Sequence, residues 1–174
     1  ALEPTFGAIN LEDIKSPECF FIEGRLRQRM KIPVFHDDQH GTAVVVAAAI
    51  LNGLRTQGKD LRTIKLVTSG AGAAALACLD LLVALGLPAR HVWLADIDGV
   101  VYSGRESGMD AFKQLFAQST SKRKLAEIIP DADVFLGLSA GGVLTPAMVA
   151  TMGPKPLILA LANPTPEIRP EAIA

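Results

Sequence analysis

The feature that most constrains the fold is a short apolar segment, residues 65–69, that runs directly into Gly-Ala-Gly-Ala-Ala-Ala at 70–75. The segment has the composition of a buried strand, and the residues after it have the small, apolar side chains of a packed helix. The junction matches the pattern G-x-G-x-x-A, in which the first glycine permits a tight turn and the second allows close approach to the backbone. The chain therefore places a strand, a tight turn and a closely packed helix in succession.

Strand-like and helix-like segments alternate through the rest of the chain. Strands are predicted over residues 65–69, 91–95, 134–138 and 157–162, and helices over 73–85, 109–129 and 146–152. The strand segments are continuous apolar runs, which is typical of strands buried on both faces. We therefore predict an α/β fold, a Rossmann-like doubly wound parallel sheet with helices on both faces.

Residues 1–60 precede this alternation and are organised differently. A helix is predicted over 17–30, a short strand over 32–35 and a long apolar helix over 41–54. The length of 174 residues suits one domain, and the abrupt start at Ala-Leu-Glu-Pro is expected either of a processed protein or of a piece of a larger enzyme. We predict one domain over 1–174, with 1–60 a helical lead-in and 61–174 the Rossmann core.

Charge and composition exclude several classes of protein. The 17 Lys and Arg residues balance 18 Asp and Glu residues, whereas nucleic-acid binders need a strong positive field. The longest uncharged apolar stretch, residues 43–51, is far shorter than the ~18 residues of a membrane span. The two cysteines have no C-x-x-C spacing and suit a reducing compartment. We expect a cytoplasmic protein without nucleic-acid or membrane partners.

The G-x-G-x-x-A junction predicts binding of an adenine dinucleotide. Gly70 permits the turn, Gly72 lets backbone amides approach a pyrophosphate, and the N-terminus of the following helix favours an anion. Asp96 follows the next strand and lies 21 positions after Ala75, close to the ~20 expected of the acid that binds the ribose hydroxyls. A Gly- and Ala-rich turn alone is a weak signal, but the strand, helix and acid around it favour binding.

The residues after Asp96 favour NAD over NADP. They are Ile97, Asp98 and Gly99, and no cation follows until Arg105. Since NADP binding usually needs an Arg near this strand end, NAD is the favoured cofactor, although a cation from another loop remains an alternative.

Two acidic pairs, Glu12-Asp13 and Asp37-Asp38, are the candidate metal ligands. Each pair alone is typical of a solvated surface. Asp37, however, follows a predicted strand, and ligands of open α/β sheets bind outside the carboxyl ends of the strands. Other polar or small residues after predicted strands are Gly70, Asp96, Ser139 and Asn163. Carboxylates beside a nucleotide site suit Mg²⁺ or Mn²⁺.

Further residues near these strand ends have weaker signals. Ser139 and Ala140 begin a Ser-Ala-Gly-Gly turn that either lets the dinucleotide pass closely or simply reverses the chain. Without thiolates, His36 and His40 are expected to be hydrogen-bonding residues of a loop and not zinc ligands, and His91 is expected to be structural.

Four segments together resemble the bacterial malic enzymes. They are Asn-Leu-Glu-Asp-Ile at 10–14, Phe-His-Asp-Asp-Gln-His-Gly-Thr-Ala at 35–43, the glycine fingerprint at 70–75 and Leu-Ala-Asn-Pro-Thr at 161–165. The resemblance spans essentially the whole chain and is closest to the hybrid type, in which a phosphotransacetylase-like region follows. It implies an NAD(P)-dependent, decarboxylating malate dehydrogenase that needs Mg²⁺ or Mn²⁺, converts malate to pyruvate and CO₂, and is a homo-oligomer at full length.

The resemblance also implies roles for particular residues. The lead-in would hold the metal through Glu12, Asp13 and Asp38, with Asp37 as a catalytic-site acid beside them. Asp38 also borders the cofactor, and Asn163 would contact substrate and nicotinamide. The remaining expected cofactor contacts are Gly70, Ala71, Gly72, Ala73, Ala74, Asp96, Ser139 and Ala140.

Malic enzymes also use a Lys general base and a Tyr general acid, which lie upstream of the Glu-Asp pair. Residues 1–11 contain neither, and the single tyrosine, Tyr102, does not match the acid. We therefore expect the chain by itself to be nearly inactive. Two alternatives stay open: the cofactor domain of an amino-acid dehydrogenase, which needs no metal cage, and a non-catalytic nucleotide-binding module.

Overall fold

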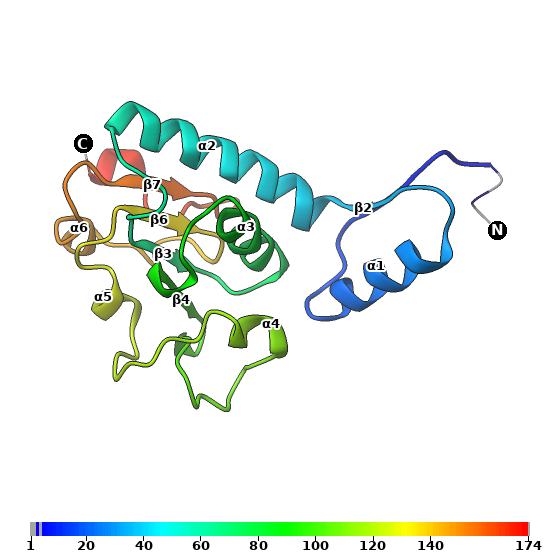
Figure 1. Ribbon diagram of the computed structural model, residues 1–174. Helices are drawn as coiled ribbons and strands as arrows, with labels where there is room; N and C mark the ends of the chain where they lie inside the picture. Colours follow the sequence, from blue (N-terminus) through cyan, green and yellow to red (C-terminus); the bar gives the residue numbers. More distant parts are fainter. Residues whose placement is uncertain (1–2, 4, 174) are drawn as a thin grey trace.

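The centre of the molecule is a five-stranded sheet with the order β5-β4-β3-β6-β7 in a computed structural model that describes residues 3 and 5–173 (Figure 1). The strands are β3 (Leu66–Ser69), β4 (Val92–Asp96), β5 (Gly99–Val100), β6 (Val134–Gly137) and β7 (Leu157–Ala160). β3 pairs in parallel with β4 and β6, and β6 pairs in parallel with β7. The predicted Rossmann-like sheet is confirmed, except that the two-residue edge strand β5 folds straight back and pairs antiparallel with β4.

Both faces of the sheet are covered, as predicted. Successive side chains of a strand point to opposite faces. Accordingly, Leu66 and Leu136 belong to one apolar cluster with α2 (Thr42–Gln57) and α3 (Ala73–Ala84). Val67 and Phe135 belong to a second cluster on the other face, together with residues of α5 (Leu125–Ile128) and α6 (Pro146–Val149). The central strands β3 and β6 are buried along their full length, which explains their uninterrupted apolar sequence.

The predicted helix over 109–129 is wrong. Only α4 (Ala111–Gln114) and α5 (Leu125–Ile128) form within it. The Asp110 side chain caps α4, but the chain then runs beside residues 101–103, where Gln118 N–H donates to the Val101 carbonyl and Ser103 N–H to the Gln118 carbonyl. Backbone groups used for these lateral bonds are lost to a helix. The remaining helices are short: α6 (Pro146–Val149), η2 (Ala89–His91) and η3 (Pro170–Ala172).

The N-terminal segment forms a second, smaller unit of secondary structure. β1 (Ile9–Leu11) and β2 (Val34–His36) pair in parallel as a separate two-stranded sheet, with α1 (Glu18–Arg29) between them in sequence. Figure 1 shows α1 standing to one side of the large sheet. The predicted strand over 32–35 is therefore displaced by one to two residues and does not belong to the large sheet, which corrects the prediction that Asp37 and Asp38 follow one of its strands.

The segment after β2 is helical and not the predicted loop. A single π-helical turn, η1 (Asp37–Gly41), continues directly into α2. The buried side of α2 includes Ile50 and Leu54, which pack in the same cluster as the large sheet. α2 ends where Gly58 adopts a left-handed conformation with φ of 69°. Within the described residues, no helix is long and apolar enough to cross a membrane.

Candidate functional site

The turn between β3 and α3 has the geometry that the G-x-G-x-x-A pattern predicts. Gly70 has a φ of 110°, and its N–H donates to the Ala95 carbonyl at 2.8 Å. A Cβ on Gly70 would overlap the backbone carbonyl of Leu138. Any larger residue is therefore excluded both by the left-handed backbone and by the neighbouring strand end.

The position of Gly72 is open, because no described atom beyond the glycine itself and its two chain neighbours lies within 4 Å of the place where its Cβ would be. It is the N-cap of α3, and the first hydrogen bond of the helix runs from Leu76 N–H to the Gly72 carbonyl. The N–H groups of Ala73 and Ala74 consequently have no partner within the helix. Ala75 is buried and holds the helix close to the sheet. An open backbone and free N–H groups at a helix N-terminus suit a phosphate.

A cavity of about 530 Å³ lies beside this turn. It brings together five of the residues predicted from the sequence, namely Gly70, Ala71, Gly72, Asp96 and Ser139. The same cavity is bordered by Ser16 and Pro17 of the lead-in and by Met109, Asp110 and Lys113 around α4. Ala140 is exposed next to Ser139. The structure therefore has a cavity at the strand ends where the sequence predicts that an adenine dinucleotide binds.

Asp96 is held by two cations, Arg105 and Lys113, so that the alternative of a cation from a later loop is the one that the structure shows. Its carboxylate accepts hydrogen bonds from Arg105 Nη2 at 2.7 and 2.8 Å and from Lys113 Nζ at 2.9 Å. Burial alone would raise the pKa of Asp96, but the hydrogen bonds from Lys113 and Arg105 outweigh it, so the pKa lies below its ordinary value. The Asp96 side chain is only 9% exposed.

These cations remove the basis for favouring NAD. Arg105 and Lys113 lie 9 and 17 positions beyond Asp96 and return to it only because the segment after β5 folds back over the strand end. Lys113 also lines the cavity. The site therefore carries an acid suited to ribose hydroxyls and a cation suited to a phosphate within one cluster.

The two acidic pairs leave the same end of the small sheet. β1 and β2 are parallel, with Leu11 opposite His36, so that Glu12-Asp13 and Asp37-Asp38 begin side by side. Asp13 N–H donates to Asp38 Oδ2 at 2.8 Å. Across residues 3 and 5–173, no three His, Cys, Asp or Glu side chains converge closely enough to hold a metal ion. The two acidic pairs are thus near neighbours but are not gathered into one metal-binding cluster, although carboxylate oxygens are the type of ligand that Mg²⁺ and Mn²⁺ prefer.

Asp37 reaches the carboxyl edge of the large sheet through the turn η1. It lines a cavity of about 350 Å³ together with Leu161, the first residue after β7, and with residues of α2. Gly41 is required there, because a Cβ would overlap the Asp37 carboxylate. Asn163 is exposed and lies two residues after Leu161. Asp37 thus lies close to the carboxyl edge of the large sheet, although it follows a strand of the small sheet.

The histidines differ from one another. His40 Nε2 bonds Glu23 Oε1 at 2.7 Å, which links η1 to α1 and agrees with the predicted hydrogen-bonding role. His36 is completely buried, with Nδ1 4.0 Å from Asp38 Oδ2, and neither ring nitrogen has a hydrogen-bond partner among the described residues. The predicted role is therefore wrong for His36. Its place on β2, facing inwards, follows from the pairing with β1.

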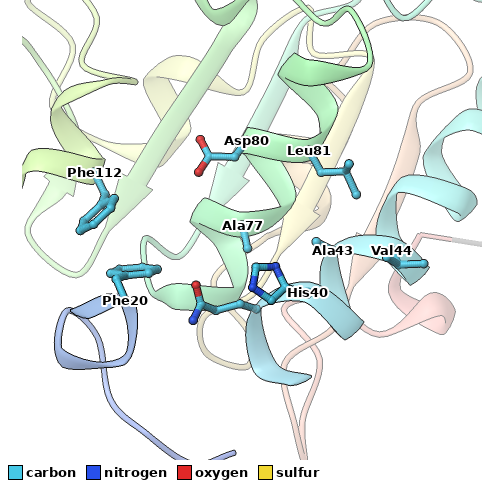
Figure 2. A pocket seen from close by; sticks show the side chains of 9 residues that line it. Phe20, His40, Ala43, Val44, Ala77, Asp80, Leu81 and Phe112 are labelled. Carbon is cyan, nitrogen blue, oxygen red and sulfur yellow. The ribbon is translucent and has the colours of Figure 1, made fainter. Parts of the chain in front are cut away.

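A third cavity of about 400 Å³ lies away from the fingerprint turn, between α1, α2, α3 and α4. Figure 2 shows the rings of Phe20 and Phe112 facing each other at one side and His40 at the other. The ring centroids of the two phenylalanines are 4.2 Å apart. The carboxyl group of Asp80 faces this cavity, and burial raises its pKa. The lining is mostly apolar, in contrast to the charged cavity at Asp96.

The strand order, the fingerprint turn and the charged cavity together define a Rossmann-like dinucleotide-binding domain. A family model described as malic enzyme, NAD binding domain, matches residues 39–174. The chain belongs to this family.

Sequence and structure relatives agree with the family. An NAD-dependent malic enzyme of Rhizobium meliloti is 66% identical over 98% of this chain, and an NADP-dependent malic enzyme of Haemophilus influenzae is 58% identical over 98%. The chain covers 22% and 23% of these two proteins, respectively. The crystal structure of an NAD-dependent malic enzyme from Thermotoga maritima matches with a TM-score of 0.92 and 42% identity over 99% of this chain and 46% of that one.

Proposed function

We propose that the chain is the nucleotide- and metal-binding part of a malic enzyme that oxidises and decarboxylates malate to pyruvate and CO₂. The observation that carries the proposal is the single cavity in which the open N-terminus of α3 lies beside the cation-bound Asp96. Family membership supports the choice of reaction. The chain spans less than a quarter of the length of its first curated relatives, so that the complete reaction involves residues outside it.

The nucleotide is bound in two halves across the carboxyl edge of the sheet. The N–H groups at Ala73 and Ala74 bind the pyrophosphate, and the adenosine ribose lies towards Asp96 and Lys113. The other half extends over β6 and β7, past Ser139, Ala140 and Asn163. The strand order supports this division, since β4 lies on one side of β3 and the chain crosses back after β5 to place β6 on the other side.

The acidic residues hold the divalent ion and the substrate end of the site. Glu12, Asp13 and Asp38 are the proposed ligands of Mg²⁺ or Mn²⁺, and Asp37 stands beside them. A bound ion would supply Lewis acidity for the C2 oxygen of malate, and a bound dinucleotide would supply the hydride acceptor. The protein residues orient both groups, and the parallel pairing of β1 with β2 supports this assignment because it brings both acidic pairs to one end of the small sheet.

Two further properties are proposed for the full-length protein. Free Cys19 and Cys78 are both buried, which suits the reducing cytoplasm. Exposed apolar side chains along α2, among them Val44, Val45 and Leu51, suit a face covered by other parts of a homo-oligomeric enzyme. The net charge of −1 supports small molecules, and not nucleic acid, as the binding partners.

Calorimetric titration with NAD and NADP, each with and without Mn²⁺, tests the proposal. We expect both nucleotides to bind and Mn²⁺ to bind in a manner that Asp38→Asn weakens. Gly72→Val serves as the matched control, because its side chain would occupy the space left for the phosphates. Nucleotide binding without any Mn²⁺ binding would favour an amino-acid dehydrogenase domain, and binding of neither would overturn the proposal.

A further inference from the structure

Glu167 is a fully buried carboxylate that the proposed function does not use. It has no exposed surface, and its described hydrogen-bond partners are all in two loops of the large sheet. Burying a carboxylate away from water is costly unless its oxygens accept hydrogen bonds. A buried carboxylate is stable only where several hydrogen-bond donors surround it. The segments that carry these donors are the segments that the carboxylate holds in place.

The two oxygens of Glu167 connect two different loops. Oε1 accepts a hydrogen bond from Ser139 N–H at 2.8 Å, just after β6, and lies 3.4 Å from the Ser139 hydroxyl. Oε2 accepts one from Ala162 N–H at 3.0 Å, just after β7. One side chain thus joins the carboxyl ends of two neighbouring parallel strands.

The surrounding backbone is built around this connection. A Cβ on Gly137 would overlap the Glu167 carboxylate, so that β6 ends in glycine where the carboxylate passes. Leu144 N–H donates to the Glu167 carbonyl at 3.1 Å, and Gly142 N–H donates to the Pro166 carbonyl at 3.1 Å. The segment around Glu167 therefore supports the whole loop that follows β6.

We infer that Glu167 is a positioning residue that holds the loops after β6 and β7 together as one platform for the nicotinamide half of the dinucleotide. The inference rests on the proposed function, because it needs a dinucleotide that crosses from β4 to β6 and β7. Ser139 Oγ also lies 2.8 Å from Ser69 Oγ, so that the platform is tied to the end of β3, where the pyrophosphate turn begins.

The chemistry explains why a carboxylate is needed. Each oxygen receives a backbone N–H from a different loop, and both oxygens of an ionised carboxylate accept. Glutamine has the same shape but only one accepting oxygen. Glu167→Gln would therefore release either Ser139 or Ala162 from its partner while leaving the size of the side chain unchanged.

The test compares two ligands in the same variant. ADP-ribose carries the adenosine half and both phosphates but lacks nicotinamide, whereas NAD carries all parts. Titration of Glu167→Gln is expected to show NAD binding weakened about tenfold, the effect of one lost buried hydrogen bond, and ADP-ribose binding within about twofold of the parent chain. The matched control is Glu171→Gln, an exposed residue of η3 that undergoes the same change of charge.

A purely structural role would weaken both ligands equally, and that result would overturn the inference. Failure of the parent chain to bind either ligand would overturn the proposed function and, with it, this inference. If Glu167→Gln does not fold, the parent chain provides the second measurement by NMR. NAD, but not ADP-ribose, should shift the backbone amide signals of Ser139 and Ala162, and equal shifts with both ligands would contradict the platform.

Discussion

At the scale of the residue, the charges around Asp96 determine the character of the nucleotide site. The Arg105 guanidinium is buried, and besides Asp96 it donates to the backbone carbonyls of Gly99, Val100 and Ser107. It therefore fixes the turn after β4 as well as the carboxylate. Removing the acid would leave the buried guanidinium with only the half-exposed Asp98, 3.4 Å away, as its counter-charge, which is more costly than losing an exposed ion pair.

Asp96→Asn should destabilise the chain at neutral pH by about 2 to 4 kcal/mol, because Arg105 and Lys113 lose their anionic partner. The folded-state pKa of Asp96 lies below its ordinary value, so its stabilising contribution is complete above about pH 4 and is lost as the pH falls through the folded-state pKa. Urea unfolding at pH 7 and at pH 3 measures this, with the exposed Glu106→Gln as the control. A stability difference that is the same at both pH values would contradict the ion-pair assignment.

Lys113→Gln should separate the two nucleotides. Lys113 Nζ lies 2.9 Å from Asp96 Oδ2 at the wall of the cavity, where the 2′-phosphate of NADP would add negative charge. Loss of this cation should weaken NADP binding about tenfold more than NAD binding, the value of one charge-assisted contact. Calorimetry on both ligands measures the ratio, with exposed Lys31→Gln as the matched variant. An equal effect on both nucleotides would place Lys113 outside the 2′-phosphate site.

At the scale of the element, the β3–α3 turn shows why two glycines in one motif have different tasks. Gly70 is needed for the fold, since its φ of 110° and the nearby Leu138 carbonyl exclude a side chain. Gly72 is needed for the ligand, since the space beside it is open. The sequence alone shows both as identical letters of one pattern, and only their surroundings distinguish them.

This difference predicts opposite behaviour of two substitutions. Gly70→Ala should lower the free energy of unfolding by about 1 to 3 kcal/mol through backbone strain and overlap. Gly72→Val should change stability by less than about 1 kcal/mol and abolish nucleotide binding by filling the phosphate space. Denaturant unfolding and nucleotide titration of both variants provide the measurements. Retained nucleotide binding by Gly72→Val would show that the phosphates lie elsewhere.

At the scale of the whole molecule, the lead-in and the large sheet share one structure. α2 follows the acidic turn η1 without interruption and packs with α3 and the sheet in one apolar cluster. The lead-in helix α1 is attached more lightly, through His40 to Glu23 and through the ring contact of Phe20 with Phe112. The placement of the candidate metal ligands therefore depends on how firmly α1 and the small sheet are attached to the rest of the molecule.

The two cysteines report on that attachment. Cys19 is buried in α1, and Cys78 is buried in α3, where burial raises its pKa to about 12. Because the thiolate is the reactive form, neither should react with a disulfide reagent in the native chain, and both should react in guanidinium. Counting released thiolate by absorbance measures this. Reaction at Cys19 alone would show that α1 detaches from the sheet in solution.

The chain by itself should turn over malate at least about 10²-fold more slowly than a full-length relative, because general acid and base groups contribute that much. Its only tyrosine, Tyr102, is stacked on Arg123 with the guanidinium 3.6 Å from the ring centre, beside the β4–β5 turn and not beside the acidic pairs. NAD reduction with malate and Mn²⁺ measures this activity. Comparable rates would show that residues within the chain supply the proton transfers.

Much of the fold was predictable from local sequence. Continuous apolar segments identified the four parallel strands of the large sheet, because burial on both faces leaves no polar alternation. The two glycines identified the turn, since few other residues allow it. The sequence could not show that residues 109–129 do not form one helix, because their apolar residues have helical spacing. Only the backbone hydrogen bonds to residues 101–103 interrupt the helix.

The order of elements, the dinucleotide fingerprint and the presence of two acidic pairs can all be read from the amino-acid sequence. The tertiary structure decided that Arg105 and Lys113 meet at Asp96, that the acidic pairs leave adjacent strands of a separate sheet, and that Glu167 joins two loops. The reason is physical. Turn conformation and the pattern of buried residues depend on residues that are close in the sequence, so they can be recognised from it. An ion pair or a buried carboxylate depends on which distant segments the packed core brings together.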